Sequence, residues 1–105
     1  MAKFILLFFG GHPKIEERLT HFKQWVDWIE HYKKTGQFLM GAPFTPEGKI
    51  IQGPEKKVSD KAMAPDDMGG YVVIQAVNLQ EAVDIARTCP IYDVGGWIEV
   101  HQSMN

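Results

Sequence analysis

The alternation of apolar and polar positions predicts a chain of strands and two helices. The aromatic and branched run Phe4–Phe9 is bounded by Gly10-Gly11 and is typical of a strand buried on both faces. Further β-forming segments occupy residues 37–43, 49–52, 71–77 and 97 to about 101. Residues 53–70 are rich in Gly, Pro, Asp and Lys without a clean period, so they predict a long loop with at most a short extended piece near Val58.

The first helix is predicted from Pro13 to about Thr35, with Gly36 as its C-terminal stop. One stripe of apolar residues recurs at steps of three and four and is expected to face the core: Ile15, Leu19, Phe22, Val26 and Ile29. A second, more aromatic stripe runs beside it: His21, Trp25, Trp28 and Tyr32. Either this stripe flanks the core or packs in a dimer, or it lines a small-molecule pocket, for which Tyr and Trp offer a flat apolar body with one polar end.

The second helix begins with a capping-box pattern, Asn78 followed by Glu81, and ends before Pro90. Apart from the short 49–52 segment, the resulting order is strand, helix, strand, strand, helix, strand. This order predicts an α+β, ferredoxin-like βαββαβ fold, in which two helices cover one face of an antiparallel sheet. We expect a single domain over residues 1–105.

The face of the sheet that the helices leave open is expected to be largely apolar. Val72, Ile74 and Ala76 are expected to face the helices, as are Ile98 and Val100. The opposite face would then carry Trp97, Glu99 and His101 beside large residues of the first strand. Since exposed apolar patches of this kind usually mark an interface, we expect a homodimer that pairs sheet against sheet, with a covering 53–70 loop as the alternative.

Composition narrows the possible functions. The chain has 105 residues and a formal net charge of -2, which disfavours a general nucleic-acid binder. Cys89 is the only cysteine, so an internal disulfide is impossible, and the histidines show no metal-ligand spacing. No apolar run approaches the ~20 residues of a membrane helix, and no phosphate-loop or dinucleotide fingerprint occurs. We therefore expect a cytoplasmic protein with no cofactor, no metal ion and no membrane partner.

Several segments together resemble the YCII-related, or DGPF-domain, family. The segments are Trp25-x-x-Trp28 with Gly36, Gln37 to Pro43, Val58-Ser59-Asp60, Gly69 to Ile74, Glu81 to Pro90, and Gly95 to Val100. The resemblance implies a ferredoxin-like fold that pairs into a dimeric α/β barrel, and it implies little about chemistry. In the signature Asp-Gly-Pro-Phe only Asp60 matches, because Lys61-Ala62-Met63 follow it. Trp25 stands where one branch of the family carries a histidine, so a His–Asp pair is not carried over.

The candidate catalytic residues are Asp60, Glu99 and His101. Asp60 is either a carboxylate that caps its loop or a general base at a cavity rim. Glu99 and His101 project from the same side of one strand, so they form either a proton-transfer pair or an interface salt link. The candidate ligand-binding residues are His21, Trp25, Trp28 and Tyr71, around a small apolar cavity between the sheet and the first helix.

Two minor candidates have structural interpretations. His12 lies in a Gly-Gly-His-Pro turn, where a role at the helix start is favoured, and Cys89 is expected to be buried in the core. Two functions stay open: a non-catalytic dimer that binds a small molecule, or a cofactor-independent isomerase or lyase that moves a proton on a small ring-bearing substrate.

Overall fold

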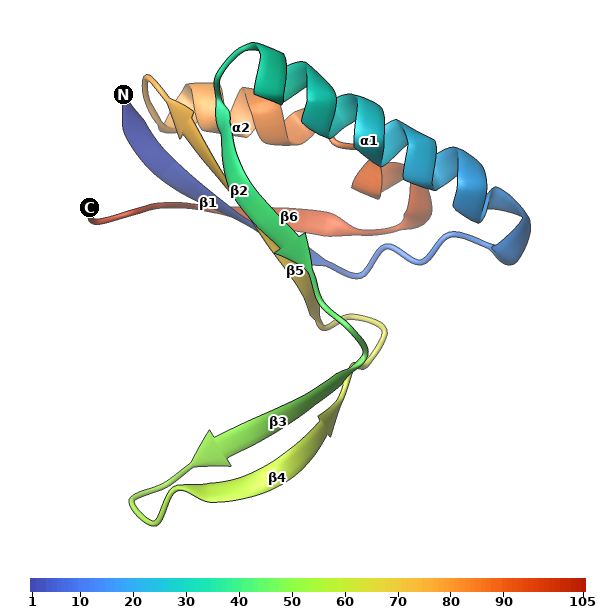
Figure 1. Cartoon of the computed structure of the whole chain (residues 1–105), viewed down its shortest axis with the longest axis vertical. Helices are drawn as coiled ribbons and strands as arrows, with labels where there is room; N and C mark the ends of the chain where they lie inside the picture. Colours follow the sequence, from blue (N-terminus) through green and yellow to red (C-terminus); the bar gives the residue numbers. More distant parts are fainter.

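The computed structural model describes residues 1–105 and contains two helices and six strands (Figure 1). The elements are β1 (Ala2–Phe9), α1 (Arg18–Lys34), β2 (Phe38–Pro43), β3 (Glu47–Gln52), β4 (Lys57–Ala62), β5 (Met68–Ala76), α2 (Leu79–Arg87) and β6 (Trp97–Gln102). Short 3-10 turns precede α1 and β6, at Ile15–Glu17 and Pro90–Val94. No helix is both long and apolar enough to cross a membrane.

Four of the strands form one antiparallel sheet in the order β2-β5-β1-β6. Both helices lie on the same side of this sheet (Figure 1). The sheet order and the two helices on one face are those of a ferredoxin-like fold, so the predicted fold class is confirmed. The helix start differs from the prediction, because residues before Ile15 are not helical and Pro13 lies outside the helix. The predicted cap of α2 is present, with Asn78 Oδ1 accepting the Glu81 N–H at 2.9 Å.

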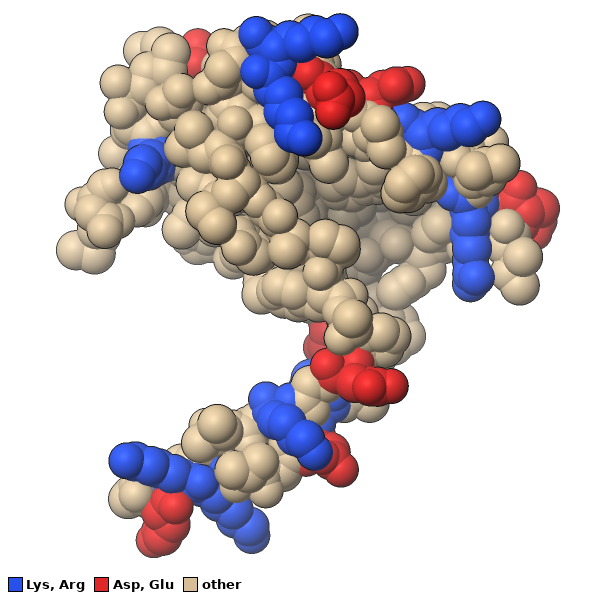
Figure 2. Space-filling view, viewed as in Figure 1, with Lys and Arg blue, Asp and Glu red and all other residues tan.

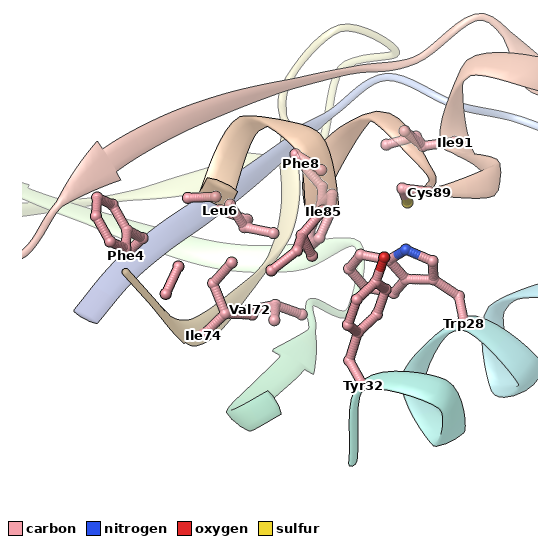
Figure 3. Close-up of a cluster of buried hydrophobic side chains, with 13 residues drawn as sticks. Phe4, Leu6, Phe8, Trp28, Tyr32, Val72, Ile74, Ile85, Cys89 and Ile91 are labelled. Carbon is pink, nitrogen blue, oxygen red and sulfur yellow. The ribbon is translucent and has the colours of Figure 1, made fainter. Parts of the chain in front are cut away.

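The core lies between the helices and one face of the sheet (Figure 3). Alternate residues of β1 and β5 point into it, and Phe4, Leu6 and Ile74 are completely buried. The predicted inward set on β5 is therefore correct. Ile98 and Val100 of β6 also pack against this core, as predicted, whereas Trp97, Glu99 and His101 are exposed on the other face.

The face that α1 turns to the core differs from the prediction. Trp28 and Tyr32 are buried, and Trp25 packs against the core, so the aromatic stripe faces inward. Most of the stripe predicted to face the core is exposed instead, with Leu19 66% and Phe22 64% exposed, and only Ile29 of that stripe packs against the core. The larger rings bury more apolar area, and their polar atoms find partners, which favours this orientation of the helix.

Residues 53–70 do not form the predicted loop, and they do not cover the open face of the sheet. Lys57–Ala62 forms β4, which pairs with β3 in an antiparallel hairpin, and β5 already begins at Met68. The hairpin projects away from the body, on the side of the sheet opposite the helices (Figure 1). Its strands are exposed along their whole length, which explains why no buried period marks them in the sequence.

Candidate functional site

A cavity of about 430 Å³ lies between α1 and the sheet. The space-filling view shows the surface hollowed below α1, toward the base of the hairpin, with few charged side chains around the hollow (Figure 2). Residues from seven parts of the chain line it: Phe8, Gly10 to His12, five residues of α1 (His21, Phe22, Trp25, Val26 and Ile29), Phe38 with Gly41 to Pro43, Met63 with Asp67, Gly69 to Val72, and Ile91. Most of this lining is apolar, as is usual for a small-molecule site.

Trp25 forms an aromatic wall of the cavity. Its ring meets Phe8 edge to face at 5.1 Å between ring centroids, and it meets Trp28 in the same way at 5.7 Å. The Trp25 indole Nε1–H donates to Nε2 of His21 at 2.8 Å. Because Nε2 accepts, the neutral His21 ring carries its proton on Nδ1, which is buried without a partner. His21 therefore fixes the orientation of the wall.

Behind the Trp25 wall, Thr88 at the C-terminal end of α2 forms hydrogen bonds with Trp28 and Tyr32. Its hydroxyl accepts from Trp28 Nε1 at 2.9 Å, lies 2.9 Å from the Tyr32 hydroxyl, and donates to the Ile85 carbonyl at 2.6 Å. With its own proton given to Ile85, the Thr88 oxygen accepts from both aromatic groups. The inward polar atoms of Trp28 and Tyr32 are thus satisfied, and the rings keep one orientation.

Two glycines form part of the cavity floor where β2 approaches β5. A Cβ at Gly41 would lie 2.7 Å from the Tyr71 carbonyl oxygen, and one at Gly70 would lie 2.8 Å from the Ala42 carbonyl oxygen. Since these neighbours are backbone atoms, a side chain at either position would push the strands apart. Both glycines therefore keep the floor open and the strands close.

The polar part of the lining comes from two segments that contact each other. One is the segment before β5, and the other is the turn after β1. The His12 Nε2–H donates to the Pro65 carbonyl at 2.7 Å, so the neutral ring keeps its lone pair on Nδ1. Asp67 accepts from the Ala64 N–H at 2.7 Å and pairs with Lys61 at 2.8 Å. The hydrogen bond from Lys61, followed by that from Ala64, lowers the pKa of the Asp67 carboxyl. At neutral pH the Asp67 side chain in this part of the lining is therefore a carboxylate.

The structure places the sequence-predicted site residues in three separate places. His21, Trp25 and Tyr71 line the cavity, whereas Trp28 lies behind its wall. Asp60 lies on β4, where its largely exposed carboxylate pairs with Lys49. Glu99 and His101 approach each other, with 3.2 Å between Oε1 and Nε2, on the open face of the sheet. Neither Asp60 nor this pair is among the residues that line the cavity.

His12 and Asp67 also line the cavity, although the sequence did not predict this for either residue. His12 makes no cap at the helix start, because its side chain bonds the Pro65 carbonyl 53 residues away. The turn position of His12 beside Gly10-Gly11 was visible in the sequence, but its partner was not. Asp67 was hidden in a segment without a pattern.

Cys89 is buried, as expected. Burial raises the pKa of its thiol to about 12, so the reactive thiolate is scarce at neutral pH. No group of three or more His, Cys, Asp or Glu side chains is placed to hold a metal ion.

Comparison of the sequence with known protein families gives a match over nearly the whole chain. The model of the YCII-related domain matches residues 3–102. The chain belongs to the YCII-related family. No curated protein matches the sequence significantly.

Among solved structures, this YCII-related chain is similar to 5-chloro-2-hydroxyhydroquinone dehydrochlorinase from Burkholderia phenoliruptrix, determined in complex with 2,5-dihydroxybenzoquinone. The TM-score is 0.58 at 15% sequence identity, and the match covers 97% of this chain and 94% of the other. At this identity the likeness supports the ferredoxin-like fold of the YCII-related chain.

Proposed function

We propose that this protein binds a small, flat, largely apolar molecule in the cavity beneath α1, and that it does so as a homodimer. The main support for the proposal is the aromatic wall formed by Trp25, whose orientation is fixed by its neighbours. Trp25 is held by its hydrogen bond to His21 and by edge-to-face ring contacts with Phe8 and Trp28. A ring-shaped ligand can therefore pack on this indole without a rearrangement of the protein. A preformed wall reduces the entropy lost on binding.

The cavity also suggests which polar groups the ligand carries. The cavity volume of about 430 Å³ lies in the range of small-molecule sites. Its lining offers two acceptors, the His12 Nδ1 lone pair and the Asp67 carboxylate, so it favours a ligand with hydroxyl or N–H donors. The negative charge of Asp67 disfavours a ligand carboxylate at the same place. A hydroxylated aromatic ring fits both conditions, and the molecule bound by the dehydrochlorinase is also a small ring with oxygen substituents.

The homodimer is supported by the open face of the sheet. Phe9 and Trp97 stack there at 5.7 Å between ring centroids, and Trp97 is 41% exposed. Ile5 and Leu7 lie in the same row of β1 and are only partly covered. Because burial of a large apolar side chain contributes about 1.5–3 kcal/mol, a second sheet packed on this row would stabilise the protein substantially. The Glu99–His101 pair would then lie in the interface.

A cofactor-independent enzyme of isomerase or lyase type is the alternative. The observation that favours it is the His12 ring, whose Nε2–H is held by a carbonyl while Nδ1 keeps the lone pair that a general base needs. In this alternative His12 removes a proton from a ring-bearing substrate.

Calorimetric titration with 2,5-dihydroxybenzoquinone and simple substituted phenols tests the binding proposal. We expect at least one of these probes to bind the wild type, and Trp25→Ala to weaken its binding by about tenfold or more, because the wall loses a large aromatic surface. His31→Ala is the matched control, since His31 lies on the same helix, is exposed and does not line the cavity. Equal affinity for the wild type and Trp25→Ala would contradict the proposed site.

The enzyme alternative is tested with the probes that bind. We expect a proton-transfer enzyme to exchange ring-bound hydrogen of its substrate for deuterium in heavy water, and His12→Gln to abolish the exchange while binding persists. Exchange that continues unchanged in His12→Gln would remove His12 from the chemistry.

A further inference from the structure

The β3–β4 hairpin lacks a packing partner within its own chain. Every residue of both strands is exposed, and the hairpin projects clear of the body (Figures 1 and 2). An isolated two-stranded hairpin is marginally stable in water, because it has no third strand or helix on which to bury a face. The hairpin therefore needs a surface that its own chain does not supply.

The register of the hairpin identifies the face that needs cover. Ile51 lies directly opposite Val58, and these side chains are 67% and 58% exposed. Lys49 lies opposite Asp60, two residues along each strand, so this ion pair occupies the same face as the apolar pair. The other face carries Ile50 opposite Ser59 and is more polar.

The side of α1 at the mouth of the cavity carries a second apolar surface without a partner. Leu19 and Phe22 are about two-thirds exposed, at 66% and 64%, and Val26 is 40% exposed. These residues are one helical turn apart and form a continuous stripe. Phe22 and Val26 also line the cavity, so whatever covers the stripe lies against the cavity as well.

The length of the hairpin matches the distance to this stripe in a second copy. Strands of six residues extend for roughly 20 Å, away from the helices and beyond the open face of the sheet (Figure 1). Two packed sheets lie about 10 Å apart, and a helix layer lies about 10 Å beyond. A hairpin that leaves one sheet in this direction therefore reaches the helix layer of a copy packed on the open face.

We propose that the β3–β4 hairpin of one copy packs its Ile51–Val58 face on the Leu19–Val26 stripe of a second copy, and covers that copy's cavity. This inference rests on the homodimer of the proposed function and names a second contact within it. Two-fold symmetry makes the contact reciprocal, so both stripes and both hairpins are buried at once. The contact also brings Asp60 and Lys49 of one copy to the cavity of the other, which supplies polar groups that its own chain holds far away.

Disulfide trapping tests the contact directly. Cys89 is buried with a raised thiol pKa, so cysteines introduced on the surface react selectively. We expect the double variant Leu19→Cys with Val58→Cys to form covalent dimers under mild oxidation, at least tenfold faster than Gln80→Cys with Val58→Cys. Gln80 is the matched control because it is exposed on the other helix.

A second measurement does not depend on cysteine chemistry. Sedimentation equilibrium of Ile51→Ser with Val58→Ser should show a dimer dissociation constant at least tenfold above the wild type, because the buried apolar pair is lost. Ile50→Ser is the matched control, since this residue lies on the other face of the same hairpin. Neither change removes a buried side chain of the monomer, so the subunit is expected to fold.

The outcomes distinguish failure of the hairpin contact from failure of the homodimer. A wild-type dimer that forms no 19–58 disulfide and tolerates the double serine variant overturns the hairpin contact and leaves the sheet-to-sheet dimer standing. Covalent dimers formed as fast by Val58→Cys alone indicate that hairpins contact each other, and this also overturns the contact with α1. A wild-type monomer at micromolar concentration overturns the homodimer itself, whereas a dimer that binds no probe affects only the ligand proposal.

Discussion

The hydrogen bonds of the Thr88 hydroxyl behind the aromatic wall predict how much stability Thr88→Val should lose. Valine has nearly the shape of threonine, so the substitution removes one hydroxyl and leaves the packing in place. The Trp28 indole N–H and the Tyr32 hydroxyl then lose their common acceptor, while their rings are only 7% and 9% exposed. A buried donor without a partner costs about 1–3 kcal/mol.

The expected loss lies near the lower end for each group, because Thr88 itself is exposed and admits water. We expect the free energy of unfolding to fall by about 2 kcal/mol in total, which lowers Tm by roughly 10 °C for a domain of this size. Urea unfolding followed by tryptophan fluorescence and by circular dichroism measures both quantities.

Two variants serve as controls for this prediction. Thr88→Ser keeps the hydroxyl and should retain most of the stability, whereas Thr20→Val makes the same chemical change at an exposed position of α1. If Thr88→Val falls within about 0.5 kcal/mol of Thr20→Val, the hydroxyl does not brace the wall and the reasoning fails.

Three further predictions concern the glycines, the cysteine and the carboxylate of the cavity region. Gly70→Ala should be destabilised by more than about 1 kcal/mol, because its Cβ meets the Ala42 carbonyl oxygen at 2.8 Å, while Gly69→Ala, with no atom within 4 Å, should unfold like the wild type. With a thiol pKa of about 12, Cys89 should have roughly one thiolate in ten thousand at pH 8 and react with a thiol reagent only after denaturation; rapid reaction of the native protein would contradict its burial. The lowered pKa of Asp67 means that its ionised form adds stability above the ordinary value of 3.8, and that this stability is lost as the pH falls through the lower pKa of the folded state. The stability advantage of the wild type over Asp67→Asn should therefore shrink below about pH 4, and an advantage that grows there would refute the assignment.

The strands of the main sheet could be predicted because one of their faces is buried. Alternation of buried and partly exposed residues in β1 and β5 follows directly from the pleat, and the sequence displays it. The side of α1 that faces the core could not be predicted from periodicity, because both of its stripes are apolar. The choice depends on Thr88, which is 60 residues from Trp28 in the chain and offers an acceptor to the inward rings.

The candidate site was predictable only where it follows a periodic element. The aromatic stripe suggested a pocket beside the helix, and His21 and Trp25 do line one. His12 and Asp67 reach the same cavity through contacts between distant loops, such as the Gly10 N–H that bonds the Asp67 carbonyl at 3.3 Å. No local pattern marks such contacts. The hairpin escaped prediction because all of its residues are exposed, so hydrophobic periodicity carries no signal there.

The paired glycines of the cavity floor have a consequence for how ligand preference can change among related sequences. At Gly41 and Gly70 the depth of the pocket comes from missing side chains, and any addition there disturbs the sheet itself. New selectivity therefore has to arise on the opposite wall, where the exposed Phe22 and Val26 of α1 can be exchanged without moving a strand. The sheet side of the pocket is therefore constrained, whereas the side chains on the α1 side can vary.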